Sequence, residues 1–204
     1  MRHDQSFKNL ILDYPREALA FFAAEEAGAL DPSVRVVPLR QEQLQERLGE
    51  RFRELDVPLL VEWPDGRRAA LVFVIEEETE PGRFSIHRLA HYCLDLAELA
   101  GTERVVPVVI FLRAGAAPRR LELAGERNSY LTFTYLACAL AEEPAERHTD
   151  STNLVARVNL PNMAHSREAR VQLYGAALQG LLALERDVDK QKKYLDFIDG
   201  YAQL

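Results

Sequence analysis

The stretch Leu55-Asp-Val-Pro-Leu-Leu-Val-Glu-Trp63, followed by Pro64-Asp-Gly-Arg67 and then Arg68-Ala-Ala-Leu-Val-Phe-Val-Ile-Glu-Glu-Glu78, decides the fold. Two apolar runs flank a Pro-Asp-Gly turn, so the sequence predicts a β-hairpin. If the two strands pair through this turn, Asp56 arrives near Glu76. Carboxylates then gather where an apolar sheet ends, and such a cluster must hold a cation, raise a pKa or lie in water.

The patterns on either side of the hairpin predict a mixed α/β fold. Before it, apolar residues at helical spacing indicate helices around Phe7–Ile11 and Ala18–Phe22, and Val34–Leu39 reads as a short strand. After it, Ile86 begins a helix that closes at Gly101. The run Val105–Leu112 then predicts a strand buried on both faces. The predicted order is therefore helix, strand, strand, strand, helix, strand, with an α+β mixed sheet.

The rest of the chain predicts a further hairpin and a helical end. Tyr130–Leu136 reads as a strand with Arg120–Leu123 as its partner. From Ser166 onward apolar residues recur at helical spacing, which predicts either one long helix or an α-hairpin. We therefore expect a core over 1–142 and a helical extension over 143–204. The extension packs either on the core or on a second subunit, as a homodimer.

Composition limits the class of protein. The chain has 204 residues, of which 48% are hydrophobic and 28% charged, so one main domain is expected. No apolar run is long enough to span a membrane and the first residues lack a secretion signal, so we expect a cytoplasmic protein. A net charge of −7 counts against a nonspecific nucleic-acid coat. Arg113, Arg119, Arg120 and Arg127 still lie in one stretch, as a local basic rim or a solvated surface.

The predicted carboxylates suit a hard divalent cation. Asp56 and Glu76, on adjacent strands, are oxygen ligands of the kind that Mg²⁺ (or Mn²⁺) prefers. Such an ion supplies the Lewis acidity that hydrolysis of a phosphodiester needs. Glu78, two residues further on, would reach the attacking water or a second metal. The alternative is that Asp56 begins a turn and the glutamates form a solvated strand end.

Other reactive side chains are less informative. His87 and His91 stand four apart, as in some zinc sites, but no third ligand is in sight, so we expect them to be exposed or to face phosphate. Cys93 and Cys138 form no CxxC motif, and we expect buried free thiols. No glycine-rich phosphate loop and no nucleophilic serine elbow occur.

The order of several motifs resembles a known group. These are the opening His3-Asp-Gln-Ser-Phe-Lys8, Asp56, the phrase Val74-Ile-Glu-Glu-Glu-Thr-Glu-Pro81, the helix Arg88-Leu-Ala-His-Tyr92 and the tail Asn153-Leu-Val-Ala-Arg-Val-Asn-Leu-Pro161. Together they resemble the PD-(D/E)xK nuclease superfamily, and within it the Rpn family of recombination-promoting nucleases and transposase-like proteins. The resemblance covers most of the chain. Each motif is weak alone, and their order carries the comparison.

The resemblance implies a restriction-endonuclease-like core and Mg²⁺-dependent cleavage of DNA. It implies Asp56 and Glu76 as metal ligands, Glu78 as the third catalytic position, and Lys8, Arg88 and Tyr92 as DNA contacts. The superfamily motif has Lys where this chain has Glu78, and a glutamate there can only accept a proton or bind another cation. Two alternatives therefore stay open: a catalytically degenerate member that binds protein or nucleic acid, and an unrelated hydrolase of small phosphoesters.

Overall fold

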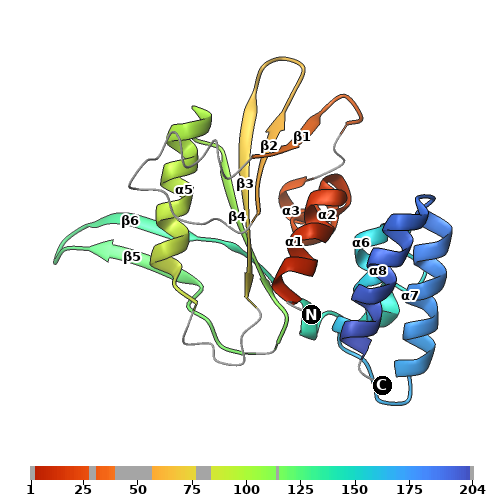
Figure 1. Cartoon of the computed structure of the whole chain (residues 1–204). Helices are drawn as coiled ribbons and strands as arrows, with labels where there is room; N and C mark the ends of the chain where they lie inside the picture. Colours follow the sequence, from red (N-terminus) through yellow and green to blue (C-terminus); the bar gives the residue numbers. More distant parts are fainter. Residues whose placement is uncertain (1–2, 28–30, 40–56, 77–83, 114, 203–204) are drawn as a thin grey trace.

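A five-stranded mixed sheet forms the centre of the molecule (Figure 1). The computed structural model describes residues 3–27, 31–39, 57–76, 84–113 and 115–202, with the backbone alone at 3–4, 27 and 68–76. The sheet order is β1-β2-β3-β4-β7. The strands are β1 (Arg35–Pro38), β2 (Val57–Glu62), β3 (Arg68–Glu76), β4 (Val105–Phe111) and β7 (Leu136–Ala139).

The predicted hairpin is confirmed. β2 and β3 are antiparallel, with Val57 opposite Phe73. The turn is closed because the Gly66 N–H donates to the Trp63 carbonyl and the Trp63 N–H donates to the Arg67 carbonyl, both at 3.0 Å. Gly66 has φ 84°, a left-handed conformation that glycine adopts at little cost. The start of β2 and the end of β3 therefore lie at the same edge of the sheet.

The predicted helix between the third and fourth strands is also confirmed. Helix α5 (Ile86–Ala100) begins at Ser85, whose hydroxyl accepts from the Arg88 N–H at 3.2 Å, and ends at Gly101 with φ 60°. It joins β3 to β4 as parallel neighbours, and β7 is parallel to β4. Because parallel strands share a direction, β3, β4 and β7 all end at the edge where β2 begins. We call this the carboxyl edge.

One predicted strand is wrong in extent. The stretch Tyr130–Leu136 is split between β6 (Ser129–Thr134) and β7. β6 pairs with β5 (Arg120–Ala124), as predicted, in a separate ribbon that projects from the body (Figure 1). The break falls at Tyr135, where the chain passes from the ribbon into the main sheet and the Tyr135 Oη donates to the Pro118 carbonyl at 2.9 Å.

Helices cover both faces of the main sheet (Figure 1). α1 (His3–Asp13) and α2 (Pro15–Phe22) lie on one face and α5 lies on the other. β4 contributes to both sides, because Val108 and Ile110 belong to the cluster with α1 while Val109 belongs to the cluster with α5. The predicted double burial of this strand is therefore confirmed. The shorter elements are α3 (Ala24–Ala27), η3 (Leu140–Glu142), η4 (Ala145–Arg147), α6 (Leu154–Val158) and η5 (Leu160–Asn162).

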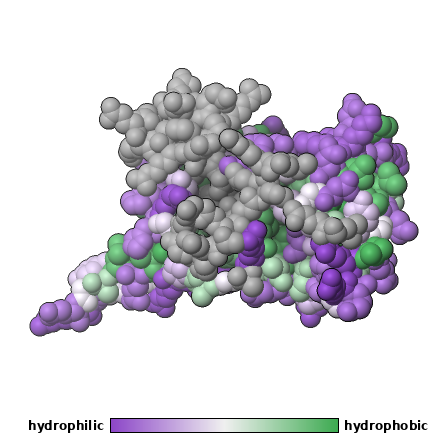
Figure 2. Space-filling model, turned by 60° about the horizontal axis from the view of Figure 1, so that its bottom comes forward, coloured by the Kyte–Doolittle hydropathy of each residue, from purple (hydrophilic) through white to green (hydrophobic). Residues whose placement is uncertain are grey.

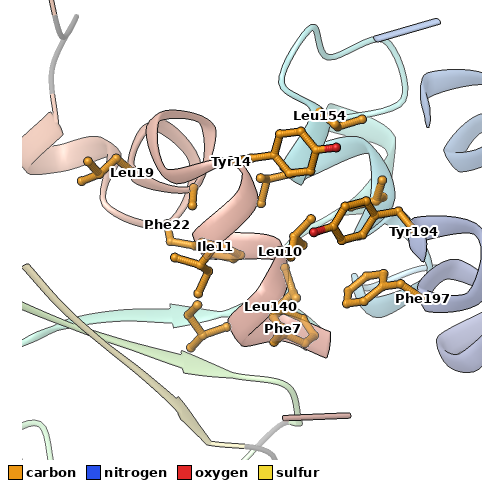
Figure 3. Packing of buried hydrophobic residues seen from close by; sticks show 14 of the residues in the cluster. Phe7, Leu10, Ile11, Tyr14, Leu19, Phe22, Leu140, Leu154, Tyr194 and Phe197 are labelled. Carbon is orange, nitrogen blue, oxygen red and sulfur yellow. The ribbon is translucent and has the colours of Figure 1, made fainter. Parts of the chain in front are cut away.

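The C-terminal region is an α-hairpin, the second of the two predicted forms. α7 (Arg170–Leu184) and α8 (Val188–Ala202) are antiparallel, since Tyr174 Oη donates to Asp199 Oδ1 at 2.6 Å across their open end. The hairpin packs against α1, and the Phe7 and Phe197 rings meet edge to face with centroids 5.2 Å apart (Figure 3). One hydrophobic cluster therefore runs across the predicted boundary between residues 142 and 143.

A cluster of polar side chains links the end of α1 to the C-terminal α-hairpin. Tyr194 Oη donates to Asp13 Oδ2 at 2.5 Å, Lys193 Nζ lies 2.7 Å from the same oxygen, and Tyr14 Oη donates to Glu185. Burial raises the pKa of the Asp13 carboxyl, but the hydrogen bonds from Lys193 and Tyr194 outweigh this, so its pKa lies below its ordinary value. Burial likewise raises the pKa of Glu185, and the bonds from Tyr14 and two backbone N–H groups lower it by more.

This cluster predicts a loss of stability in acid. Carboxyl groups whose pKa is lowered on folding stabilise the protein above their unfolded pKa, about 3.9 for Asp, and lose that contribution as pH falls through the folded pKa. We expect Asp13→Asn to lower the free energy of unfolding at pH 6 by about 1 kcal/mol, a small value because Asp13 is only half-buried and solvent screens part of its interaction with Lys193. Urea unfolding at pH 6 and pH 3 measures this loss. The difference in free energy of unfolding between wild type and Asp13→Asn should be smaller at pH 3 than at pH 6. A difference that does not change with pH would contradict the stabilising role of the Asp13 carboxylate.

Candidate functional site at the carboxyl edge

Glu76 stands at the carboxyl edge, as the last residue of β3 and the register partner of Phe111 in β4. β3 is the middle strand of the sheet, antiparallel to β2 and parallel to β4. Asp56 and Glu78, the other two predicted site residues, lie outside the described residues. For Glu76 the structure describes the backbone and not the side chain. The structure thus places the backbone of one predicted ligand, and the convergence of Asp56 with Glu76 stays a prediction.

The start of α5 lies at the same edge. The Phe84 ring, just before the helix, meets the Phe111 ring edge to face with centroids 5.8 Å apart. Arg88, in the first turn, is exposed, so this predicted DNA contact reaches solvent at the carboxyl edge. His87 and His91 are exposed as predicted.

The other two predicted DNA contacts are placed differently. The Tyr92 side chain is only 7% exposed and packs in the cluster between α5 and the sheet. Its ring therefore contributes to the core, and a contact with DNA would need its hydroxyl to reach past this packing. Lys8 is half-buried on α1, on the opposite face of the sheet from α5. The structure thus does not bring Lys8, Arg88 and Tyr92 together on one surface.

An arginine and three aromatic rings form a cluster that includes Phe111, the register partner of Glu76. The rings of Phe84, Phe111 and Tyr135 contact one another, with Phe84 and Tyr135 centroids 5.2 Å apart. The Arg119 guanidinium lies 5.2 Å from the centroid of Phe111 and 5.9 Å from that of Tyr135. The sequence predicts a basic rim that includes Arg119, but not this stacking, because the three rings come from separate segments.

A cavity of about 400 Å³ lies between strand β7 and the helices α2 and α3. Phe21 and Phe22 supply apolar lining, and Glu25, Glu142 and Glu143 supply carboxylates. His148 Nε2 lies 2.9 Å from Glu143 Oε1, and an N–H on this nitrogen donates to the carboxylate, so one of these acids already has a partner. No sequence motif indicates this cavity, because its lining comes from helices and strand more than 100 residues apart in the chain.

Neither cysteine is suited to nucleophilic chemistry. Cys93 is buried and Cys138 is half-buried, and both are free thiols, so the predicted burial is complete only for Cys93. Burial raises the pKa of each thiol to about 12, with Glu143 adding to the shift at Cys138. At neutral pH both remain protonated, and the thiolate is the reactive form.

The described residues hold no preformed metal cluster. Among the side chains that the structure describes, which leave out those of 68–76, no group of three His, Cys, Asp or Glu could hold a metal ion. Within this part of the chain, no helix is long and apolar enough to cross a membrane. Comparisons with protein-family models, with curated proteins and with solved structures find no match for the chain.

Proposed function

We propose that this chain is a Mg²⁺-dependent DNA endonuclease with a restriction-endonuclease-like core. The observation that carries the proposal is the position of Glu76 at the end of β3, the central strand, at the edge where β2 begins. In open α/β sheets, ligands bind outside the carboxyl ends of parallel strands. The element order around it, helix, three strands, helix, strand, is the one that the sequence resemblance implies.

The proposed roles follow from the chemistry of the side chains. Glu76, with Asp56 preceding β2 in sequence, would hold the divalent ion through hard oxygen donors. A bound Mg²⁺ would act as a Lewis acid on the phosphoryl group. Glu78, which replaces the lysine of the superfamily motif, would accept the proton of the attacking water. DNA would be the substrate, and a second copy of the chain, one of the two alternatives that the sequence leaves open, would be the partner.

Positive charge near the carboxyl edge supports a phosphate-bearing substrate. Arg88 is exposed in the first turn of α5, where the partial positive charge of a helix N-terminus also attracts anions. Arg119 lies over Phe111, the neighbour of Glu76 in the sheet. These groups stand out because the chain as a whole carries a net charge of −7.

The proposal is tested by the removal of metal. We expect the full chain to nick supercoiled plasmid DNA in Mg²⁺ or Mn²⁺ and to lose this activity when EDTA is added, because hydrolysis needs the cation's charge. Agarose-gel separation of supercoiled, nicked and linear forms measures it. Nicking that persists in EDTA, or none with either metal, would exclude the proposed activity. Mn²⁺ binding without nicking would favour the degenerate binding protein instead.

A further inference from the structure

The strand β7 forms one edge of the main sheet, and it pairs with β4 on its inner side only. Alternate residues of a strand turn their N–H and C=O groups to opposite sides, so half of the β7 backbone groups point away from β4. Among the described residues, no backbone group outside β4 bonds to Leu136–Ala139. The β5–β6 ribbon, which precedes β7, belongs to a separate sheet and projects from the body to a hydrophilic tip (Figure 2). The outer side of β7 is therefore a free edge within the described part of the chain.

The two edges of the main sheet differ in how they resist the addition of another strand. Free edges are commonly blocked by charged residues or by proline. The strand β1, at the other edge, carries both, because Arg35 begins it and Pro38 ends it. The sequence of β7 is Leu-Ala-Cys-Ala and contains neither. Access to β7 is instead limited by the structure around it.

The cavity of about 400 Å³ described above runs along this free edge, since all four residues of β7 line it. Successive side chains of a strand point to opposite faces of the sheet, so a cavity over one face would contact mainly alternate residues. Contact with four consecutive residues places the cavity beside the strand, on the side to which its free backbone groups point. Residues of α2, α3 and η3 form the other walls. The space therefore suits a single extended segment.

The charge of the cavity favours a basic occupant. Its described lining contains Glu25, Glu142 and Glu143 and no lysine or arginine. Glu143 already has partners, because its Oε1 lies 2.9 Å from His148 Nε2 and 3.9 Å from Arg147 Nη1. Glu25 and Glu142 are exposed and form no ion pair with a described residue. Two carboxylates thus remain for positive charges of a bound segment.

We propose that this cavity binds an extended basic segment of a partner protein, which adds to the free edge of β7 as a further strand. In this mode of recognition, main-chain hydrogen bonds supply affinity and side-chain contacts supply specificity. Lysine or arginine side chains of the segment pair with Glu25 and Glu142, and their aliphatic stems pack on the rings of Phe21 and Phe22.

Charge also indicates that the segment comes from a different protein. The other described edge strands of this chain, β1, β5 and β6, each carry at most one basic residue. A second copy of the chain therefore offers no edge strand that matches two free carboxylates. The proposal stands on the β7 edge and its cavity and is independent of the proposed nuclease activity.

The experiment measures binding of a fluorescein-labelled hexapeptide of alternating lysine and threonine, blocked at both ends, to the full chain by fluorescence anisotropy. We expect saturable binding that the double variant Glu25→Gln with Glu142→Gln weakens about tenfold, because two exposed ion pairs are lost. Glu26→Gln with Glu146→Gln is the matched control, since both residues are exposed close by in the chain but do not line the cavity. No binding to wild type, or equal effects of the two double variants, would overturn the proposal.

Methylation of the peptide backbone tests the addition of a strand. Only alternate N–H groups of an added strand face β7. N-methylation of one alternate set, at the lysines or at the threonines, should therefore weaken binding at least about tenfold, and methylation of the other set should change it less than about twofold. Equal effects of the two sets, or no effect of either, would mean that the cavity holds only the lysine side chains and would overturn strand addition.

Discussion

Glu76→Gln is expected to reduce metal-dependent nicking of plasmid DNA by about 100-fold or more. Glutamine keeps the shape of the side chain but removes the negative charge that would hold the divalent ion, and losses of this size follow when one stabiliser of transition-state charge is removed. Initial rates of nicking in Mg²⁺ measure the effect. Calorimetry should in addition show that Mn²⁺ binds the variant more weakly, because a carboxylate oxygen is a better ligand for a hard cation than an amide.

Glu62→Gln is the matched control for this change. Glu62 ends β2 at the opposite edge of the sheet, where it pairs with Arg68 in the hairpin register and lies 3.6 Å from Arg35. The chemical change is identical and the strand position is similar, but the carboxyl edge is untouched, so nicking should stay near the wild-type rate. Equal nicking rates for wild type and Glu76→Gln would contradict the proposed nuclease site, irrespective of the rate of Glu62→Gln.

Gly180→Ala should destabilise the protein by about 1–3 kcal/mol, the usual cost of overpacking a core. A Cβ at Gly180 would stand 2.5 Å from Arg157 Nε and 2.8 Å from Arg157 Cβ. The Arg157 side chain is held in this position because its Nη2 donates to the Ala176 carbonyl at 2.6 Å. The contact with Cβ matters most, since that atom is next to the backbone and cannot swing away. Urea denaturation of dilute protein measures the change.

Gly175→Ala provides the comparison on the same helix. A Cβ at Gly175 meets nothing within 4 Å, so alanine should stabilise the monomer by about 0.5–1 kcal/mol through its better helix propensity. The two Gly→Ala changes in α7 therefore have opposite expected signs. If the Arg157 side chain causes the loss at Gly180, then Gly180→Ala should be nearly neutral in an Arg157→Ala background. Additive effects of the two substitutions would contradict this cause.

Local signals in the sequence were sufficient for the central part of the fold. The Pro-Asp-Gly turn around Gly66 and the apolar runs beside it predict the β2–β3 hairpin, and Gly101 marks the end of α5. The break at Tyr135 was not predictable in the same way, because β6 and β7 continue one apolar and aromatic run but pair in different sheets. Strand periodicity indicates which face is apolar, and it does not identify the partner strand.

The candidate site was predictable only in part. The acidic end of the second apolar run places Glu76 at a strand terminus, and the structure has it there. Sequence order could not show that the helix turns Tyr92 into the core while Arg88 faces solvent, because that depends on which side of α5 meets the sheet. The stacking of Arg119 on Phe111 and Tyr135 brings together positions before and after the ribbon, so no local pattern indicates it.

The contact of Phe7 in α1 with Phe197 and Tyr201 in α8 has a consequence for synthesis on the ribosome. α1 leaves the exit tunnel well before the rings that cover part of its apolar side, because α8 lies far behind it in the chain. Domains generally fold as units and exposed apolar surface promotes aggregation. The nascent chain therefore carries an uncovered apolar helix while the intervening residues are translated, and it completes this part of its core only after α8 has emerged.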